Sequence, residues 1–193
     1  MAARRVIAGT DEAGRGPLAG PVVAAAVILS PSQRAILCDL GLGDSKKLNE
    51  ARRESLFRAM NSLGVLWRAQ AASVERIERN NILQASLWAM KRSVLALDVP
   101  VDRVLVDGNR LIPGLPFDQK ALPGADGFVP AVSAASVVAK VLRDRVMTVL
   151  DALYPQWGFK RHKGYGTAAH RDALVRLGLS PIHRPCFCRK ILS

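Results

Sequence analysis

The sequence predicts an α/β fold, a sheet of short strands flanked by helices. Short apolar runs rich in Val, Ile and Ala recur along the chain and have the length of buried strands. Longer segments with capping residues and helical spacing of apolar positions separate them. The 193 residues can bury one sizeable core, and no repeat or low-complexity linker divides them. We therefore expect a single domain over residues 1–193.

The N-terminal segment predicts a strand, a glycine turn and a second strand. The apolar run Val6–Ala8 leads into Asp11 and Glu12. A loop over Gly14–Pro17 follows, and after it comes the apolar, partly β-branched run Val22–Leu29. Two adjacent carboxylates in a protein interior are costly unless a positive charge offsets them, and a divalent cation such as Mg²⁺ or Mn²⁺ suits hard carboxylate ligands.

Two other interpretations of this segment stay open. The acidic pair, Asp11 and Glu12, can lie on a solvated turn. The spacing Gly14-x-Gly16-x-x-Ala19 also fits a dinucleotide-binding loop loosely. That loop requires a helix directly after it, whereas a strand is expected here. Because consecutive strand residues point to opposite faces, the two carboxylates converge only if the backbone turns, and Gly14 is expected to allow that turn.

The middle of the chain alternates helices and strands. The expected elements are a helix from Glu50 to about Leu63 capped by Asn49, a strand over Val65–Ala71, a short helix from Ser73 that breaks near Asn80–Asn81, a longer helix over Ile82–Leu97, and a buried strand over Val104–Val106. Before them, Ser45, Lys46 and Lys47 lie in a polar loop that either binds a phosphate or forms a solvated basic turn.

Two more carboxylates follow, beside glycine or small residues. Asp107 ends the buried strand, a position where open α/β sheets usually keep their sites, although an ordinary Asp-Gly turn is the alternative. After an edge strand near Phe117–Leu122, Asp126 precedes the longest helix, which is expected from about Pro130 to Leu153. One face of this helix carries polar residues at helical spacing and either lines a phosphate track or is plain surface: Ser133, Ser136, Lys140 and Arg143.

The last third of the chain is basic. Tyr165 stands among Lys160, Arg161 and Lys163, where it can stack on a sugar or base or simply pack half-buried. Thr167 is expected to cap a short helix that reaches Leu177. We interpret His162 and His183 as phosphate or structural contacts rather than metal ligands, because neither has a second histidine at i+3 or i+4.

Composition indicates the kind of partner that the protein binds and the cellular compartment in which it is expected. The formal net charge of +12, from 28 Lys and Arg against 16 Asp and Glu, favours a polyanionic partner. Cys38, Cys186 and Cys188 form no even disulfide framework, so we expect reduced thiols and a cytoplasmic location. No run reaches the length of a membrane helix, and we expect no membrane partner. If the four carboxylates meet, they suit metal-assisted phosphodiester chemistry with two divalent ions.

Five segments together resemble the signature blocks of ribonuclease HII, the bacterial type 2 ribonuclease H. They occur in the family's order and spacing between about Val6 and Phe187: Asp11–Pro17, Asp44–Leu48, Val106–Gly108, Ser133–Lys140 and His162–Tyr165. Where the family usually has Lys-Gly before the last aspartate, this chain has Gly124–Ala125. Asp126 keeps the expected spacing of seven residues before Ser133.

The resemblance implies a ribonuclease H-like fold, a mixed five-stranded sheet flanked by helices with a small helical C-terminal part. It implies hydrolysis of the RNA strand of RNA–DNA hybrids and incision 5′ to single ribonucleotides in duplex DNA, giving 3′-hydroxyl and 5′-phosphate ends. Asp11, Glu12, Asp107 and Asp126 match the metal-binding catalytic carboxylates, and the cofactor would be Mn²⁺ or Mg²⁺.

The resemblance also implies the substrate contacts. Gly14, Arg15 and Gly16 match the loop that reads the 2′-hydroxyl, the group that distinguishes RNA from DNA. Tyr165 matches a tyrosine that stacks on the sugar, while Lys46 and Lys163 lie in matching basic blocks. The basic part from about residue 156 to 193 would complete the substrate site. We expect a monomer, and the alternative is a nucleic-acid binding module without catalysis.

Overall fold

The computed structural model describes residues 5–43 and 48–192. Its centre is a five-stranded sheet in the order β3-β2-β1-β4-β5. The strands are β1 (Ile7–Ala13), β2 (Val22–Ile28), β3 (Leu66–Ala72), β4 (Arg103–Asp107) and β5 (Asp118–Leu122). Strand β2 pairs antiparallel with β1 and β3, whereas β4 pairs parallel with β1 and β5. The expectation of a mixed five-stranded sheet with β5 at an edge is confirmed.

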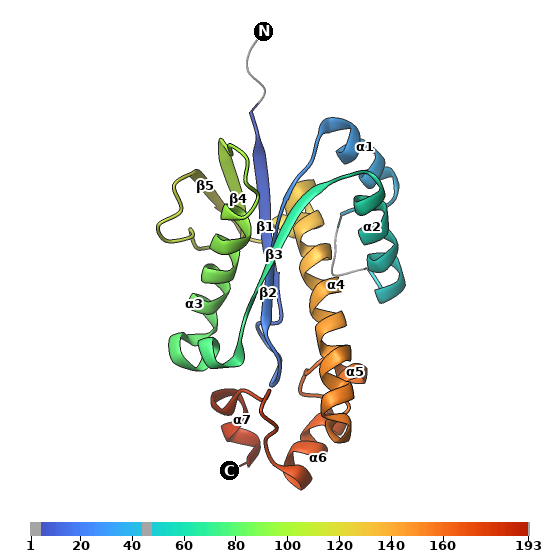
Figure 1. Ribbon diagram of the computed structural model, residues 1–193, viewed down its shortest axis with the longest axis vertical. Helices are drawn as coiled ribbons and strands as arrows, with labels where there is room; N and C mark the ends of the chain where they lie inside the picture. The colour runs from blue at the N-terminus through green and yellow to red at the C-terminus, as the bar shows by residue number, and fades with distance from the viewer. Residues whose placement is uncertain (1–4, 44–47, 193) are drawn as a thin grey trace.

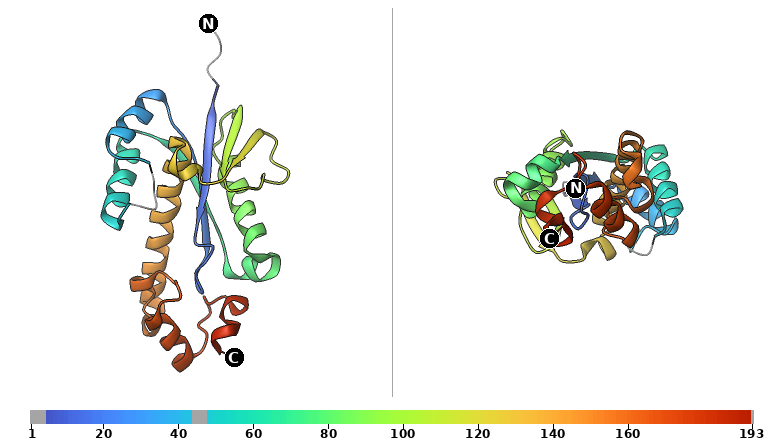
Figure 2. Two further views of the ribbon diagram at one scale, coloured as in Figure 1. Left: turned by 180° about the vertical axis from the view of Figure 1, so that it is seen from behind. Right: turned by 90° about the horizontal axis from the view of Figure 1, so that it is seen from below.

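Helices cover both faces of this sheet. They are α1 (Pro31–Asp39), α2 (Glu50–Ser62), α3 (Val74–Leu95), α4 (Pro130–Leu153), α5 (Phe159–His162), α6 (Ala168–Leu177) and α7 (Pro185–Leu192), with 3-10 turns η2 (Ala125–Gly127) and η3 (Pro155–Trp157). Helix α3 packs on one face, while α4 packs on the other and carries α1 and α2 outside it (Figures 1 and 2). In the part of the chain that the structure describes, no helix has the length and apolar character to cross a bilayer.

The two cores follow from the alternation of side chains along β2. Ala24 and Ala26 pack with α3, whereas Ala25 and Val27 pack with the α1, α2 and α4 side. All four side chains are fully buried. A strand covered on both faces has no place for polar residues, which explains its continuous apolar run.

Local capping explains most helix boundaries. The Asn49 side chain accepts a hydrogen bond from the backbone N–H of Arg52 and begins α2 as predicted. Asn81 has φ 64° and ψ 166°, which breaks the helical path of α3 at the predicted place. The bounds of α4 agree with the prediction from Pro130 to Leu153.

Helix α1 was not predicted, although the sequence carries a signal for it. The Ser30 side chain accepts a hydrogen bond from the backbone N–H of Gln33, and the Gln33 side chain accepts one from the backbone N–H of Ser30. With Pro31 in the first turn, this is a capping box. The helix buries only Leu37, so it lacks the apolar periodicity that indicates a helix.

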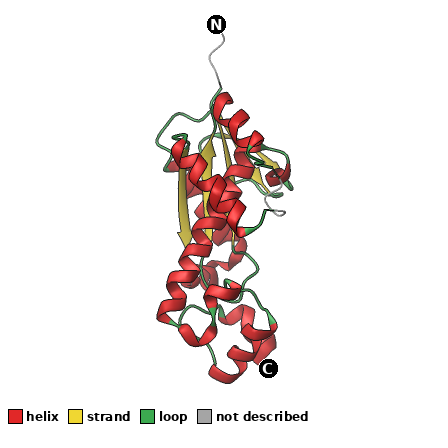
Figure 3. Ribbon diagram, turned by 90° about the vertical axis from the view of Figure 1, so that its right-hand side faces the viewer, coloured by secondary structure: helices red, strands yellow, loops and turns green. Residues whose placement is uncertain are grey.

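The C-terminal helices form a small lobe at the end of the molecule opposite the N-terminus (Figure 3). Its interior holds three buried histidines. The rings of His162 and His170 stack with centroids 4.1 Å apart, and Nε2 of His170 lies 3.0 Å from Nε2 of His183. These contacts agree with the structural interpretation of His162 and His183.

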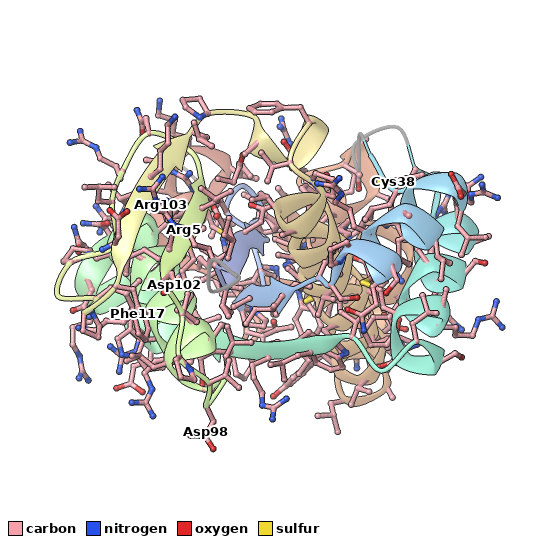
Figure 4. The ribbon with its side chains drawn as sticks, turned by 90° about the horizontal axis from the view of Figure 1, so that it is seen from above. Arg5, Cys38, Asp98, Asp102, Arg103 and Phe117 are labelled. Carbon is pink, nitrogen blue, oxygen red and sulfur yellow. The ribbon has the colours of Figure 1, made fainter. Side chains whose placement is uncertain are left out.

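At the other end of the sheet, Arg103 pairs with Asp118 at 2.6 Å, and Figure 4 looks onto that end.

Candidate active site

Strand pairing brings Asp11 and Asp107 together. The parallel ladder between β1 and β4 ends with Thr10 opposite Val106, so the two aspartates occupy the next position on neighbouring strands. Val106 packs in the core beneath α3, which turns Asp107 to the opposite, α4-covered face. A Cβ at Gly9 would lie 2.3 Å from the α4 backbone, so position 9 faces α4. Asp11 lies two residues further along the same strand and therefore points to the same face.

Glu12 reaches the same pocket by a route that differs from the prediction. The ladder with β2 continues in register through Asp11, Glu12 and Ala13, so no backbone turn separates the two acids. Strand β4 instead ends at Asp107, which leaves the β4 side of β1 without a neighbouring strand beside Glu12. The expectation that Gly14 makes the pair converge was wrong, and the early end of β4 replaces that explanation.

Asp126 comes to the pocket through the 3-10 turn η2. Gly124, with φ 72°, precedes this turn, and the backbone N–H of Asp126 donates to Oδ1 of Asp107 at 3.4 Å. The Ser133 hydroxyl donates to the carbonyl oxygen of Asp126 at 2.5 Å. The seven-residue spacing between Asp126 and Ser133 therefore corresponds to a contact that ties η2 to the first turn of α4. The replacement of Lys-Gly by Gly124–Ala125 leaves Asp126 at the pocket.

The pocket has a volume of about 370 Å³. Its lining residues are Asp11, Glu12, Ala13, Gly14, Arg53, Asp107, Asp126, Ser136, Lys140 and Tyr165. In residues 5–43 and 48–192 no three acidic, histidine or cysteine side chains are grouped, as they stand, so that they could hold a metal ion. The carboxylates thus share a pocket without forming a closed coordination shell.

Electrostatics in the pocket disfavours so much negative charge. Burial raises the pKa of Asp11 well above its usual value, and the negative charges of Glu12 and Asp107 raise it further, while a hydrogen bond with Ser136 opposes them. Burial also raises the pKa of Glu12, and the nearby guanidinium of Arg15 opposes that effect. A bound cation would relieve this repulsion.

The glycine loop after β1 reaches the pocket at Gly14, whereas Arg15 and Gly16 are not among the residues that line it. Gly14 has φ 100°, and a Cβ there would lie 2.1 Å from Nε of Arg143, so the position requires glycine. Arg15 is exposed and pairs with Glu12 at 3.3 Å. Gly16 is exposed, and a Cβ there would meet nothing within 4 Å. Strand β2, not a helix, follows this loop, which removes the dinucleotide interpretation.

Of the remaining predicted substrate contacts, one lines the pocket, one does not, and one lies outside the described residues. Tyr165 lines the pocket and is 42% exposed, with Nζ of Lys140 5.3 Å from its ring centroid. Lys163 does not line the pocket, because its Nζ donates to the Thr148 hydroxyl at 3.3 Å and lies 3.6 Å from Glu50. Lys46 lies outside the described residues, as do Ser45 and Lys47.

The polar face of α4 is only partly a pocket wall. Ser136 and Lys140 line the pocket, whereas Ser133 and Arg143 are buried. Arg143 donates to the carbonyl oxygens of Pro21 and Ala19 and is no part of a phosphate track.

Arg53 lines the pocket and was missed. It pairs with Asp144 at 3.6 Å, and Asp144 also accepts from Nζ of Lys140 at 2.7 Å. Nothing local to the α2 sequence distinguishes Arg53 from the arginines around it.

Comparisons with known proteins identify the family and agree with the fold. The family model described as Ribonuclease HII matches residues 8–190. A ribonuclease HII of Marinomonas sp. (strain MWYL1) is 49% identical over 190 residues, which cover 97% of this chain and 94% of that protein. The crystal structure of ribonuclease H2 from Pyrococcus horikoshii OT3 matches with a TM-score of 0.80 and 27% identity over 97% of both chains. A Bst-RNase HIII structure in complex with Mn²⁺ has a TM-score of 0.79 and 19% identity, covering 97% of this chain and 69% of that one.

These matches confirm the ribonuclease H-like fold and set aside the binding module without catalysis. The dinucleotide interpretation is excluded because strand β2, and not a helix, follows the glycine loop. The chain belongs to the ribonuclease HII family and is a ribonuclease H, an endonuclease that acts on RNA–DNA hybrids.

Proposed function

We propose that this ribonuclease H incises 5′ to single ribonucleotides embedded in duplex DNA, as well as cleaving the RNA strand of hybrids, and that it leaves 3′-hydroxyl and 5′-phosphate ends. The observation that carries the proposal is one pocket lined by Asp11, Glu12, Asp107 and Asp126, with Gly14 and Tyr165 on its wall. Carboxylates suited to bind metal ions and groups suited to recognise a sugar are thus available within a single pocket.

The residues of the pocket fit divalent metal ions. Asp11 is 5% exposed and Asp126 is 3% exposed, and oxygen ligands of this kind suit Mg²⁺ and Mn²⁺. Burial and the neighbouring carboxylates raise the pKa of Asp11 and Glu12, and a bound cation would favour their ionised forms. When bound, two such ions would activate water and stabilise the leaving oxygen. Asp11, Glu12, Asp107 and Asp126 would hold them once their side chains gather around the ions, since they are not grouped for this as they stand.

The other residues position the substrate. The backbone of Gly14, Arg15 and Gly16 would hydrogen-bond the 2′-hydroxyl, and Tyr165 would stack on the sugar at the junction. Lys140 and Arg53 would attract the phosphates that flank the cleaved bond, because their side chains line the same pocket. The part from about residue 156 onward completes the site through Tyr165.

The direct test is cleavage of a labelled DNA duplex that contains one ribonucleotide, with Mg²⁺ and with Mn²⁺. We expect a single incision 5′ to the ribonucleotide, an upstream end that a polymerase extends and a downstream end that a ligase accepts. The matched all-DNA duplex should stay intact. Absence of incision at every concentration of either metal, in a preparation that cleaves a continuous RNA–DNA hybrid, would refute embedded-ribonucleotide cleavage.

A second test separates chemistry from binding. Asp107→Asn keeps the shape of the side chain but removes its charge, so turnover should fall below detection while substrate affinity changes little. Asp98→Asn is the matched control, because Asp98 is exposed at the other end of the sheet with φ 55°, a conformation that Asn tolerates (Figure 4). Metal-dependent cleavage by Asp107→Asn at the rate of the control would remove Asp107 from the catalytic set.

A further inference from the structure

Arg184 makes an unusual set of contacts beneath the glycine loop. Its side chain is fully buried. Its Nε donates to the carbonyl oxygen of Gly20 at 3.0 Å, and its Nη1 donates to those of Arg15 and Pro17 at 3.0 and 2.9 Å. Its Nη2 donates to those of Gly14 and Gly20 at 2.7 and 2.8 Å. The guanidinium therefore uses all five of its N–H donors on the backbone of one loop.

Burying this charged guanidinium costs free energy of folding. Burial, and then the positive charge of Arg143, lower the pKa of Arg184 to about 9. Among the described residues Arg184 forms no ion pair, so all of its hydrogen-bond partners are backbone carbonyls, and only more distant groups such as Glu78 and Tyr165 favour its charged form. Buried charges are often no more stabilising than apolar residues of similar size, and some are retained because they specify one conformation.

The loop is docked on the C-terminal lobe at several other points. The backbone N–H of Leu18 donates to the carbonyl of Gly164 at 2.8 Å, and that of Gly20 donates to Ile182 at 2.8 Å. The backbone N–H of Arg184 donates to Leu18 at 2.8 Å. Because Gly164 precedes Tyr165, the same contacts connect the loop to the aromatic wall of the pocket.

We infer that Arg184 is a positioning residue that fixes the backbone of Gly14–Gly16 in the conformation that recognises the ribonucleotide. Its guanidinium holds the carbonyl groups of Gly14, Arg15 and Pro17 on the buried side of the loop. The inference rests on the proposed function, since it assigns Arg184 to the recognition of the 2′-hydroxyl. Lysine cannot replace it, because an ammonium offers three donors at one point and not a planar fork.

The test measures binding preference in the Asp107→Asn background, which prevents cleavage. The dissociation constants of an all-DNA duplex and of the same duplex with one ribonucleotide are compared in Mg²⁺ by fluorescence anisotropy. Arg184→Lys is the variant, and Arg189→Lys, an exposed arginine on α7, is the matched control. The ratio of the two constants is independent of the folded fraction, so loss of stability alone would not change it. Arg184→Gln supports the same comparison if the lysine variant fails to fold.

We expect Arg184→Lys to lower the preference for the ribonucleotide by about tenfold, as for loss of hydrogen bonds to a charged group, with all-DNA affinity within about twofold. The Arg189→Lys control should keep the preference of the parent. A variant that keeps the full preference while the parent shows it would overturn the role of Arg184 and leave the proposed function intact. A parent without any preference would overturn both.

Discussion

Gly14 and Gly16 lie two residues apart in the loop, and the structure predicts opposite consequences for substituting them. Gly14 has a positive φ of 100° and faces Arg143, whereas Gly16 is exposed and has no positive φ. Gly14→Ala should therefore destabilise the fold. Gly16→Ala should affect only events that involve the substrate.

The cost of Gly14→Ala has two parts. A non-glycine residue in left-handed conformation loses about 1–2 kcal/mol. The new Cβ would also lie 2.1 Å from Nε of Arg143, so that side chain must move. Its hydrogen bonds to the carbonyls of Pro21 and Ala19, at 3.1 and 3.2 Å, would weaken. Losing one bond to a charged group costs about 1.5–3 kcal/mol, which brings the total to about 3 kcal/mol or more.

Thermal unfolding and cleavage, measured on the same preparations, check this prediction. A loss of about 3 kcal/mol in a chain of this size lowers Tm by about 6–12 °C. Gly16→Ala should leave Tm unchanged or raise it slightly, since glycine removal at a compatible position stabilises by about 0.4–1 kcal/mol. Its cleavage of the single-ribonucleotide duplex should nevertheless fall, because the methyl group would project toward the sugar.

The result that would refute this reasoning is a Gly14→Ala protein with the Tm of the wild type. A Gly16→Ala protein with full cleavage would refute the close approach of the substrate at Gly16. The two outcomes are independent of each other.

Three further predictions concern the lobe, the turn η2 and the aromatic wall. Burial lowers the pKa of His183 to about 4, so between pH 6.5 and 4 the unfolded chain binds more protons than the folded one. This histidine should therefore lower the free energy of unfolding by at most about 1.4 kcal/mol for each pH unit from 6.5 toward 4. Urea unfolding measured over this pH range checks it, and a wild type that shows no such decline relative to His183→Gln would contradict it. Ser133→Ala removes the hydroxyl that holds the carbonyl of Asp126, so half-maximal activity should need several-fold more Mg²⁺, and an unchanged metal titration would exclude this role. Tyr165→Ala should weaken binding of the single-ribonucleotide duplex by about 1–3 kcal/mol while Tyr165→Phe retains it, and equal affinities for both variants would argue against stacking.

Much of the fold was predictable because its determinants are local. Asn49, Ser73 and Thr167 each cap a helix within three residues of the N–H group they accept from. Pro130 in the first turn and the break at Asn81 are equally local. Helix α1 shows the limit of apolar periodicity, since its capping box was visible but its buried face was too small to be noticed.

The site was predictable only as a list of residues. Carboxylates at strand ends and beside glycine distinguished Asp11, Asp107 and Asp126 before any pairing was known. The route of Glu12 into the pocket depends on where β4 stops, which no pattern in β1 contains. Arg53 and Arg184 have no local signal for their place at the site, because Asp144 and the glycine loop, which they contact there, lie far away in the chain.

By itself the sequence determined most of the strands and helices, the basic character of the chain and the acids that are candidates to bind metal, because capping, periodicity and charge involve residues a few positions apart. Tertiary structure alone decided that Asp11 and Asp107 meet in register and that Arg184 lies beneath a loop 170 residues away from it at Gly14. Such contacts depend on which distant segments pair and pack, and the free energy that selects them belongs to the whole core.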